Sequence, residues 1–169
     1  MLRFDRIPPG ASLADPTVLL ATWFGSGLMP FASGTWGSLA ALPFAWLILV
    51  YGGPYVLLAA AVVVFAIGVR VSDDYCRRVG ISDPGAIVID EVAAQWLTLV
   101  VAPPSLVSFA IGFFLFRLFD VIKPWPANWA DRTVKGGLGV MLDDVFAGLY
   151  AAVVLWGIEY FWGMPRWPI

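Results

Sequence analysis

The chain has 169 residues, of which 60% are hydrophobic and only 13% are charged, and its net charge is −2. This composition excludes an ordinary soluble domain, in which about a quarter of the residues are charged, and the nearly balanced charge provides no basic surface for nucleic acid. Histidine is absent, which excludes Ser-His-Asp hydrolysis, histidine phosphoenzymes and most zinc sites, because each of them needs an imidazole.

A short helix is the first element that the sequence predicts. Asp15 is suited to cap the amino end of a helix, and Pro16 is suited to its first position. The apolar residues 17–24, TVLLATWF, continue the pattern but are too few to cross a bilayer. We therefore expect a helix that lies in the membrane interface.

Five longer apolar segments follow this helix. A helix needs about 20 mostly apolar residues to cross a hydrocarbon layer of ~30 Å, and the candidates are residues 36–52, 54–71, 86–102, 105–123 and 144–163. We predict an all-α, polytopic membrane protein with about five transmembrane helices and the short interfacial helix, forming a single domain over residues 1–169.

The connections between these segments differ in charge. The linkers 52–54 (GGP) and 102–105 (APPS) are short and uncharged, whereas the connections 70–90 and 123–143 contain several Arg and Lys residues. Because basic connections stay on the cytosolic side, we expect the longer connections and the basic N-terminal segment in the cytosol and the C-terminus outside. Arg166, close to the C-terminus, is contrary to this pattern.

Two pairs of acidic residues lie at the edges of apolar segments. Asp90 and Glu91 stand near the start of the third segment, and Asp143 and Asp144 open the fifth. Carboxylates at a membrane edge are costly, so a site for one or two Mg²⁺ ions is one interpretation. Acidic residues that cap helix ends and face water are the alternative.

Basic and hydroxyl residues on other segments are predicted to reach the same membrane face. Arg117, Asp120 and Lys123 recur every third residue, which places them on one side of the fourth segment. Arg117 and Lys123 are suited to bind a phosphate, although an Arg117–Asp120 salt bridge with a solvated Lys123 is an alternative.

The stretch GSGLMPFASGTWGS, residues 25–38, precedes the first long segment. Its glycines allow successive N–H groups to point into one concavity, so Gly34, Thr35 and Ser38 are candidates for binding an anion. A plain turn is the alternative. No Lys follows the glycines as in a Walker A loop, so we expect no nucleotide.

Four blocks of the sequence together resemble the bacterial phosphatidylglycerophosphatase A family. The blocks are FGSGLMPFASGTWGS, DPGAIVIDEVAAQWLTL, FRLFDVIKPWP with DR at 131–132, and GGLGVMLDDVFAG, and the resemblance covers about residues 18–150. Ser33 and Ala94 depart from the family's usual Pro and Gly, and neither change removes a proposed ligand.

The resemblance implies a Mg²⁺-dependent lipid phosphatase of the bacterial inner membrane that converts phosphatidylglycerophosphate to phosphatidylglycerol on the cytosolic side. The membrane phospholipid is the expected partner, and protein partners are unknown. The implied metal ligands are Asp90, Glu91, Asp120, Asp143 and Asp144. The implied catalytic residues are Asp90, Glu91, Asp143, Asp144 and Thr35, and the implied phosphate-binding residues are Gly34, Thr35, Ser38, Arg117 and Lys123.

Other readings of the same residues stay open. Attack by water and a covalent route through an Asp or Thr35 are both compatible with the sequence. A small ion-coupled transporter or channel is the main alternative to an enzyme, because acids within a membrane and broken helices also mark transport paths. A lipid-binding scaffold is a third alternative, but it does not require four clustered acids.

Overall fold

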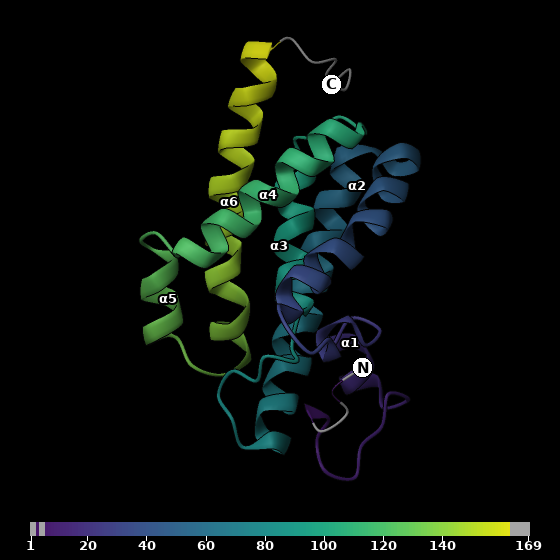
Figure 1. Ribbon diagram of the computed structural model, residues 1–169, viewed down its shortest axis with the longest axis vertical. Coiled ribbons are helices and arrows are strands. Elements are labelled where there is room, and N and C mark those ends of the chain that lie inside the picture. Colours follow the sequence, from purple (N-terminus) through teal and green to yellow (C-terminus); the bar gives the residue numbers. More distant parts are fainter. Residues whose placement is uncertain (1–2, 4–5, 163–169) are drawn as a thin grey trace.

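The computed structural model describes residue 3 and residues 6–162. Within the described residues the regular elements are helices and no strand is present, which confirms the all-α prediction. In chain order the elements are α1 (Pro16–Ala21), the 3₁₀ helix η2 (Ser26–Leu28), α2 (Ser33–Val79), α3 (Ile89–Leu99), α4 (Leu106–Ile122), α5 (Ala127–Thr133) and α6 (Gly136–Trp162). Figure 1 shows α6 as a long helix beside α3, and α5 beside the first turns of α6.

Helix α1 begins as the sequence predicts. Asp15 is its N-cap and accepts a hydrogen bond from the Thr17 amide at 2.9 Å, with Pro16 at the first helical position. The helix ends at Ala21, earlier than expected, because Trp23 and Phe24 adopt positive φ angles of 43° and 56° that turn the chain.

Helix α2 is two helices that meet at Gly53. This residue has φ 76° and ψ 179°, values outside the helical region. A straight helix of 47 residues would be about 70 Å long, yet the Ser33 hydroxyl at one end donates to the Gly85 carbonyl just beyond the other end at 2.5 Å. The two halves therefore fold back as a hairpin (Figure 1), in agreement with the two segments predicted on either side of residues 52–54.

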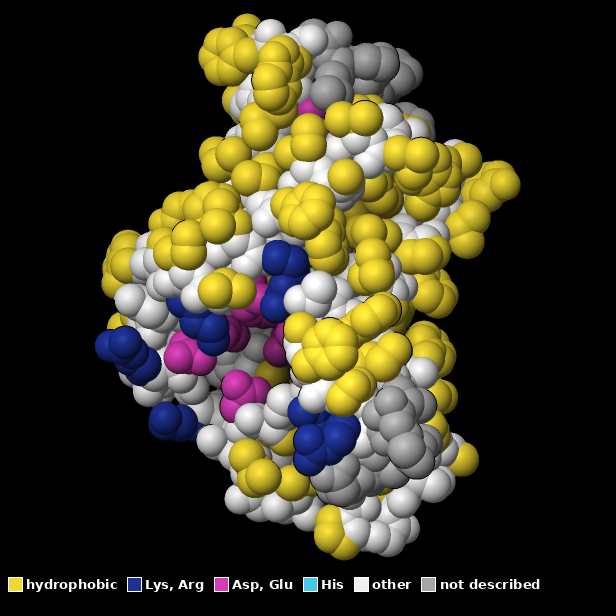
Figure 2. All heavy atoms as spheres, viewed as in Figure 1, with side chains coloured by type: hydrophobic (Ala, Val, Ile, Leu, Met, Phe, Trp, Pro, Cys, Tyr) yellow, Lys and Arg dark blue, Asp and Glu magenta, His cyan; other side chains and the backbone are white. Residues whose placement is uncertain are grey.

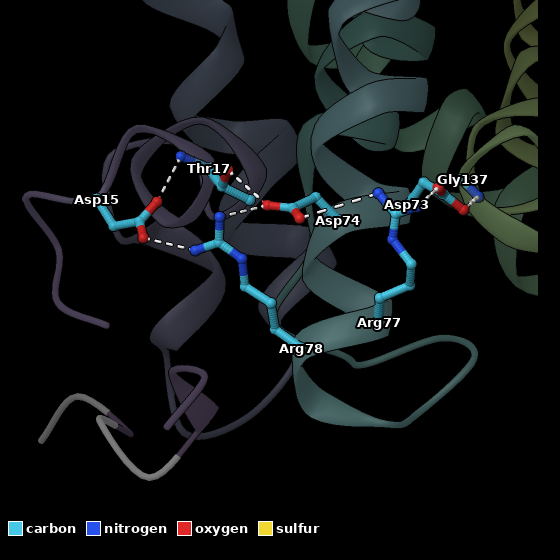
Figure 3. A network of polar contacts seen from close by, with 7 residues as sticks. All are labelled: Asp15, Thr17, Asp73, Asp74, Arg77, Arg78 and Gly137. Carbon is cyan, nitrogen blue, oxygen red and sulfur yellow. Dashed lines mark hydrogen bonds and ion pairs between the residues drawn. The ribbon is translucent and has the colours of Figure 1, made fainter. Parts of the chain in front are cut away.

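The second half of α2 continues past residue 71, where the apolar segment was predicted to end. Acidic and basic residues one turn apart stabilise the extension: Asp73 pairs with Arg77 at 3.4 Å, and Asp74 pairs with Arg78 at 2.6 Å. Arg78 also binds Asp15 at 2.6 Å, which ties the start of α1 to this end of α2 (Figure 3).

The connection 123–143 is more ordered than predicted, and one prediction about it is wrong. It contains α5, and α6 begins at Gly136 rather than at residue 144. A β-carbon at Gly137 would overlap the Val69 carbonyl of α2, so glycine allows the first turn of α6 to pack directly on α2. Asp143 and Asp144 consequently lie in the third turn of α6 and do not open it.

Helix α3 is the central helix that positions its neighbours. Trp96 donates its indole N–H to the Ala41 carbonyl of α2 at 3.0 Å, and the Thr98 hydroxyl donates to the Gly148 carbonyl of α6 at 3.2 Å. A β-carbon at Gly148 would lie 2.8 Å from the Ala94 carbonyl. The glycine therefore brings α6 against α3, and the start of α3 faces the third turn of α6.

Two helices, α2 and α6, are long and apolar enough to cross a membrane. Helix α3, with 11 residues, spans about 16 Å, and α4, with 17 residues, spans about 25 Å at 1.5 Å per residue. Both are shorter than a hydrocarbon layer of ~30 Å. The last predicted segment reaches residue 163, and this residue and Arg166 lie outside the described residues.

Candidate active site

Three carboxylates from two helices converge at one place. Asp90 and Glu91 occupy the first turn of α3, and Asp144 lies on α6. One carboxylate oxygen from each lies within 4.8 Å of the others. Figure 2 shows acidic side chains gathered around a hollow on this face of the molecule, with basic side chains beside them and a broad apolar surface above.

One oxygen of each carboxylate in this cluster lacks a hydrogen-bond partner. In the described part of the chain, Asp90 Oδ1, Glu91 Oε2 and Asp144 Oδ2 are buried and accept no hydrogen bond. Buried carboxylates side by side repel one another and lose hydration, so they need a compensating cation. Hard oxygen donors with free lone pairs fit Mg²⁺, and the three residues present can therefore hold such an ion.

Arg117 joins the acidic cluster to the start of α2. Its Nη1 lies 2.7 Å from Asp120 Oδ2 and 3.8 Å from Glu91 Oε1, and it donates to the Ser38 hydroxyl at 3.4 Å. The Arg117–Asp120 salt bridge considered from the sequence is therefore present. The same guanidinium nitrogen also faces residues of α3 and α2, so Arg117 is part of the site.

The glycine-rich stretch forms the first turn of α2 beside this arginine. A β-carbon at Gly34 would overlap the Glu91 carboxylate and would lie 3.0 Å from Arg117 Nη1. The Ser38 hydroxyl donates to the Gly34 carbonyl at 2.9 Å. Thr35, the residue after Gly34, is half-buried. The first N–H groups of a helix have no partner within the helix, so this end of α2 presents donors near the acidic cluster.

Lys123 and Asp143 form a separate pair. Lys123 Nζ binds Asp143 Oδ2 at 2.6 Å and Asp131 Oδ1 at 2.7 Å, and the Asp143 side chain is only 8% exposed. Asp143 is not one of the three clustered acids. Of the four acids in the two predicted pairs, three therefore lie together, and the fourth, Asp143, forms an ion pair with Lys123.

Two polar residues near the site were not among the predicted site residues. Asp131 and Asp143 both form ion pairs with Lys123. The same two aspartates line a polar cavity of about 60 Å³. Gln95 is fully buried, and within the described chain its amide has no hydrogen-bond partner. The spacing could have indicated Gln95, because it follows Glu91 by four residues and so shares its helix face.

Comparison with known proteins identifies the family. The sequence profile of phosphatidylglycerophosphatase A matches residues 19–159, which include every residue of the site described above. The chain belongs to the phosphatidylglycerophosphatase A family. The resemblance predicted from four sequence blocks is thereby confirmed.

Two bacterial members of the family are similar to the chain over most of their length. The chain is 41% identical to phosphatidylglycerophosphatase A of Escherichia coli over 152 residues, covering 89% of this chain and 87% of that protein. It is 37% identical to phosphatidylglycerophosphatase A of Haemophilus influenzae over 150 residues, covering 88% and 92%.

A third relative is named after a different lipid substrate. A protein of Bacteroides thetaiotaomicron, provisionally named a phosphatidylinositol-3-phosphatase, is 36% identical over 159 residues, covering 90% of this chain and 94% of that protein. No solved structure matched the chain. The names of these three relatives share one chemistry, which is the hydrolysis of a phosphate monoester on a lipid head group.

Proposed function

We propose that this member of the phosphatidylglycerophosphatase A family removes the terminal phosphate of phosphatidylglycerophosphate in a Mg²⁺-dependent reaction and releases phosphatidylglycerol. The observation that carries the proposal is the convergence of Asp90, Glu91 and Asp144, each with one unpartnered carboxylate oxygen. Arg117 Nη1 lies beside this cluster, 3.8 Å from the other oxygen of Glu91, Oε1. Acids alone would repel a phosphate, whereas acids with a cation and an adjacent guanidinium attract it.

The residues of the site have distinct roles in this proposal. Asp90, Glu91 and Asp144 hold Mg²⁺, which when bound polarises the phosphate and lowers the pKa of water. Arg117 and the first N–H groups of α2 bind the phosphoryl oxygens and stabilise the charge that develops on them. A carboxylate of the cluster accepts the proton of the attacking water. Asp120 orients Arg117 through their 2.7 Å ion pair.

Lys123, Asp143 and Thr35 have supporting roles. Lys123 pairs with Asp143, the residue before Asp144 on α6, and its ammonium offsets negative charge next to the acidic cluster. Thr35 lies in the first turn of α2, and in this proposal its hydroxyl donates a hydrogen bond to the phosphate. A covalent intermediate on Thr35 or on an aspartate is the competing route, and retention of configuration at phosphorus would distinguish it from direct attack by water.

We place the site at the cytosolic side of a bacterial inner membrane, with five helical crossings in the two halves of α2 and in α3, α4 and α6. The reason is the positive-inside rule: the basic residues gather at the end of the bundle that holds the acidic cluster, with Arg77 and Arg78 in the last turn of α2, Arg132 in the last turn of α5 and Lys135 between α5 and α6. Crossings shorter than ~30 Å in α3 and α4 require local thinning of the bilayer around the bundle.

The transporter or channel alternative needs a polar route through the bundle. Helix α6 carries no charged residue between Asp144 and Glu159, a distance of about 22 Å along the helix at 1.5 Å per residue. The charged side chains around the hollow in Figure 2 gather at one end instead. This distribution favours a site that opens at one membrane face.

Release of phosphate from defined lipids tests the proposal. Purified protein in detergent should hydrolyse phosphatidylglycerophosphate with added Mg²⁺ and lose this activity in EDTA. Phosphatidylinositol 3-phosphate, the substrate in the name of the Bacteroides relative, is the comparison. Faster hydrolysis of the phosphoinositide would replace the proposed substrate, and full activity after exhaustive chelation would refute the metal-dependent mechanism.

A further inference from the structure

An apolar groove leads away from the candidate site along the outside of the bundle. It has a volume of about 570 Å³ and runs between the first half of α2 and α4. All of its lining residues are apolar: Leu39, Leu42, Pro43, Trp46, Leu106, Phe109, Ala110, Phe113 and Phe114. The volume lies within the range of small-molecule sites, which is about 300–1,000 Å³.

The two ends of the groove differ in chemistry. Near one end Arg117 donates to the Ser38 hydroxyl at 3.4 Å. Neither residue lines the groove, but each is close along its helix to one that does: Ser38 precedes Leu39, and Arg117 follows Phe113 by one helical turn. At the other end the rings of Trp46 and Phe109 pack edge to face with centroids 5.0 Å apart. The groove thus starts near a phosphate-binding arginine and ends at an aromatic pair.

We infer that this groove binds an acyl chain of the lipid whose phosphate occupies the site. The inference rests on the proposed function. A lipid phosphate anchored at Arg117 needs an apolar surface nearby for its chain, and Phe113, which lines the groove, lies one helical turn before Arg117 on α4. From Leu39 to Trp46 the groove extends about 10 Å along α2 at 1.5 Å per residue, so it holds the part of the chain nearest the head group.

Burial of this chain contributes to recognition of the substrate. Within a membrane the chain leaves lipid rather than water, so the gain comes from close packing of the chain against the side chains of the groove. The groove therefore distinguishes a long-chain lipid phosphate from a soluble phosphate monoester with the same head group. Residues of the groove determine this preference without contacting the reacting phosphate.

A substitution that fills the groove provides the test. Ala110 is exposed and lines the groove, so Ala110→Phe should occlude it. Ala59→Phe is the matched control, because Ala59 is an exposed alanine on the second half of α2, outside the groove. We expect Ala110→Phe to reduce kcat/KM for long-chain phosphatidylglycerophosphate about tenfold, to leave hydrolysis of its dibutyryl analogue unchanged, and Ala59→Phe to change neither.

The outcomes distinguish failure of the acyl-chain inference from failure of the proposed function. Equal losses on both substrates, or no loss on either, would overturn the inference that the groove binds an acyl chain. If the parent protein hydrolyses neither lipid, the proposed function fails, and the groove is then tested by photolabelling. Phosphatidylglycerophosphate with a diazirine in its acyl chain should label the peptide 106–114 in the parent and label it several-fold less in Ala110→Phe. Equal labelling of this peptide in both proteins would overturn the inference that the groove binds an acyl chain.

Discussion

Gly34 of α2 packs against the carboxylate of Glu91 of α3, and a side chain at position 34 would occupy the same space as that carboxylate. The contact joins the glycine-rich stretch to the acidic cluster, although 56 residues separate them in sequence. It explains why the chain has no side chain at this position.

Replacing this glycine should displace Glu91 without removing any polar group. We expect Gly34→Ala to lower kcat about a hundredfold, because small displacements of catalytic groups have effects of that size. Gly157→Ala is the control, since Gly157 is helical and a β-carbon there would meet no atom within 4 Å. Steady-state kinetics on both variants checks the prediction, and an active Gly34→Ala protein would contradict it.

Neutral amides at the three clustered carboxylates should abolish metal binding. Asp90→Asn, Glu91→Gln and Asp144→Asn are each expected to reduce kcat about a hundredfold or more, a loss of about 3 kcal/mol in transition-state stabilisation. They should also lose the increase in Tm that Mg²⁺ gives the parent. Asp73→Asn, outside the cluster, should retain both properties. An amide variant with the parent's response to Mg²⁺ would exclude that residue as a ligand.

Lys123 should affect stability as well as substrate binding. Removing its ammonium in Lys123→Ala leaves the buried Asp143 carboxylate without its 2.6 Å partner, and we expect a loss of about 1–2 kcal/mol in the free energy of unfolding because the lysine is partly exposed. The double variant Lys123→Ala/Asp143→Asn should recover much of this loss. A double-mutant cycle of thermal stability measures the coupling, and additive effects would show that the pair is not coupled.

The contact between Asp15 and Arg78 should make stability depend on pH in acid. The hydrogen bond from Arg78 lowers the pKa of Asp15 below its ordinary value of 3.8. The stabilising contribution is therefore present above this value and is lost as the pH falls through the lowered pKa of the folded state. We expect the Tm difference between the parent and Arg78→Gln to be constant from about pH 7 to 5 and to shrink below about pH 4.

A second variant isolates the titration of Asp15. In Asp15→Asn the carboxyl that titrates is absent, so adding Arg78→Gln to it should give a Tm difference that no longer changes between about pH 4 and 3. The ion pair between Arg78 and Asp74 is retained in Asp15→Asn. A pH dependence that persists unchanged in this background would assign the effect to Asp74 instead.

Membrane orientation is checked by reporters fused at loop positions. A cytosolic reporter after Gly80 or Lys135 should be active, and one inserted at Gly53 should behave as external, because the kink at Gly53 lies at the opposite end of the α2 hairpin from Ser33 and Gly85. An external signal after Lys135 would remove the basis for a common cytosolic site.

The sequence by itself determined the class of the protein and most of its helices. Long neutral segments, the N-cap at Asp15 and the break at residues 52–54 are local features, because hydropathy and backbone preferences act over a few residues. The four sequence blocks were likewise enough to indicate the family, and the candidate carboxylates could be named from their positions at the edges of apolar segments.

The tertiary structure decided which of these residues meet. The sequence named both Asp143 and Asp144 as metal ligands and did not specify which of the two faces the bundle. In α6 Asp144 joins Asp90 and Glu91, while Asp143 binds Lys123. The early start of α6 likewise depends on contact between Gly137 and α2. These outcomes follow from helix rotation and close packing between distant segments, which hydropathy and local spacing do not specify.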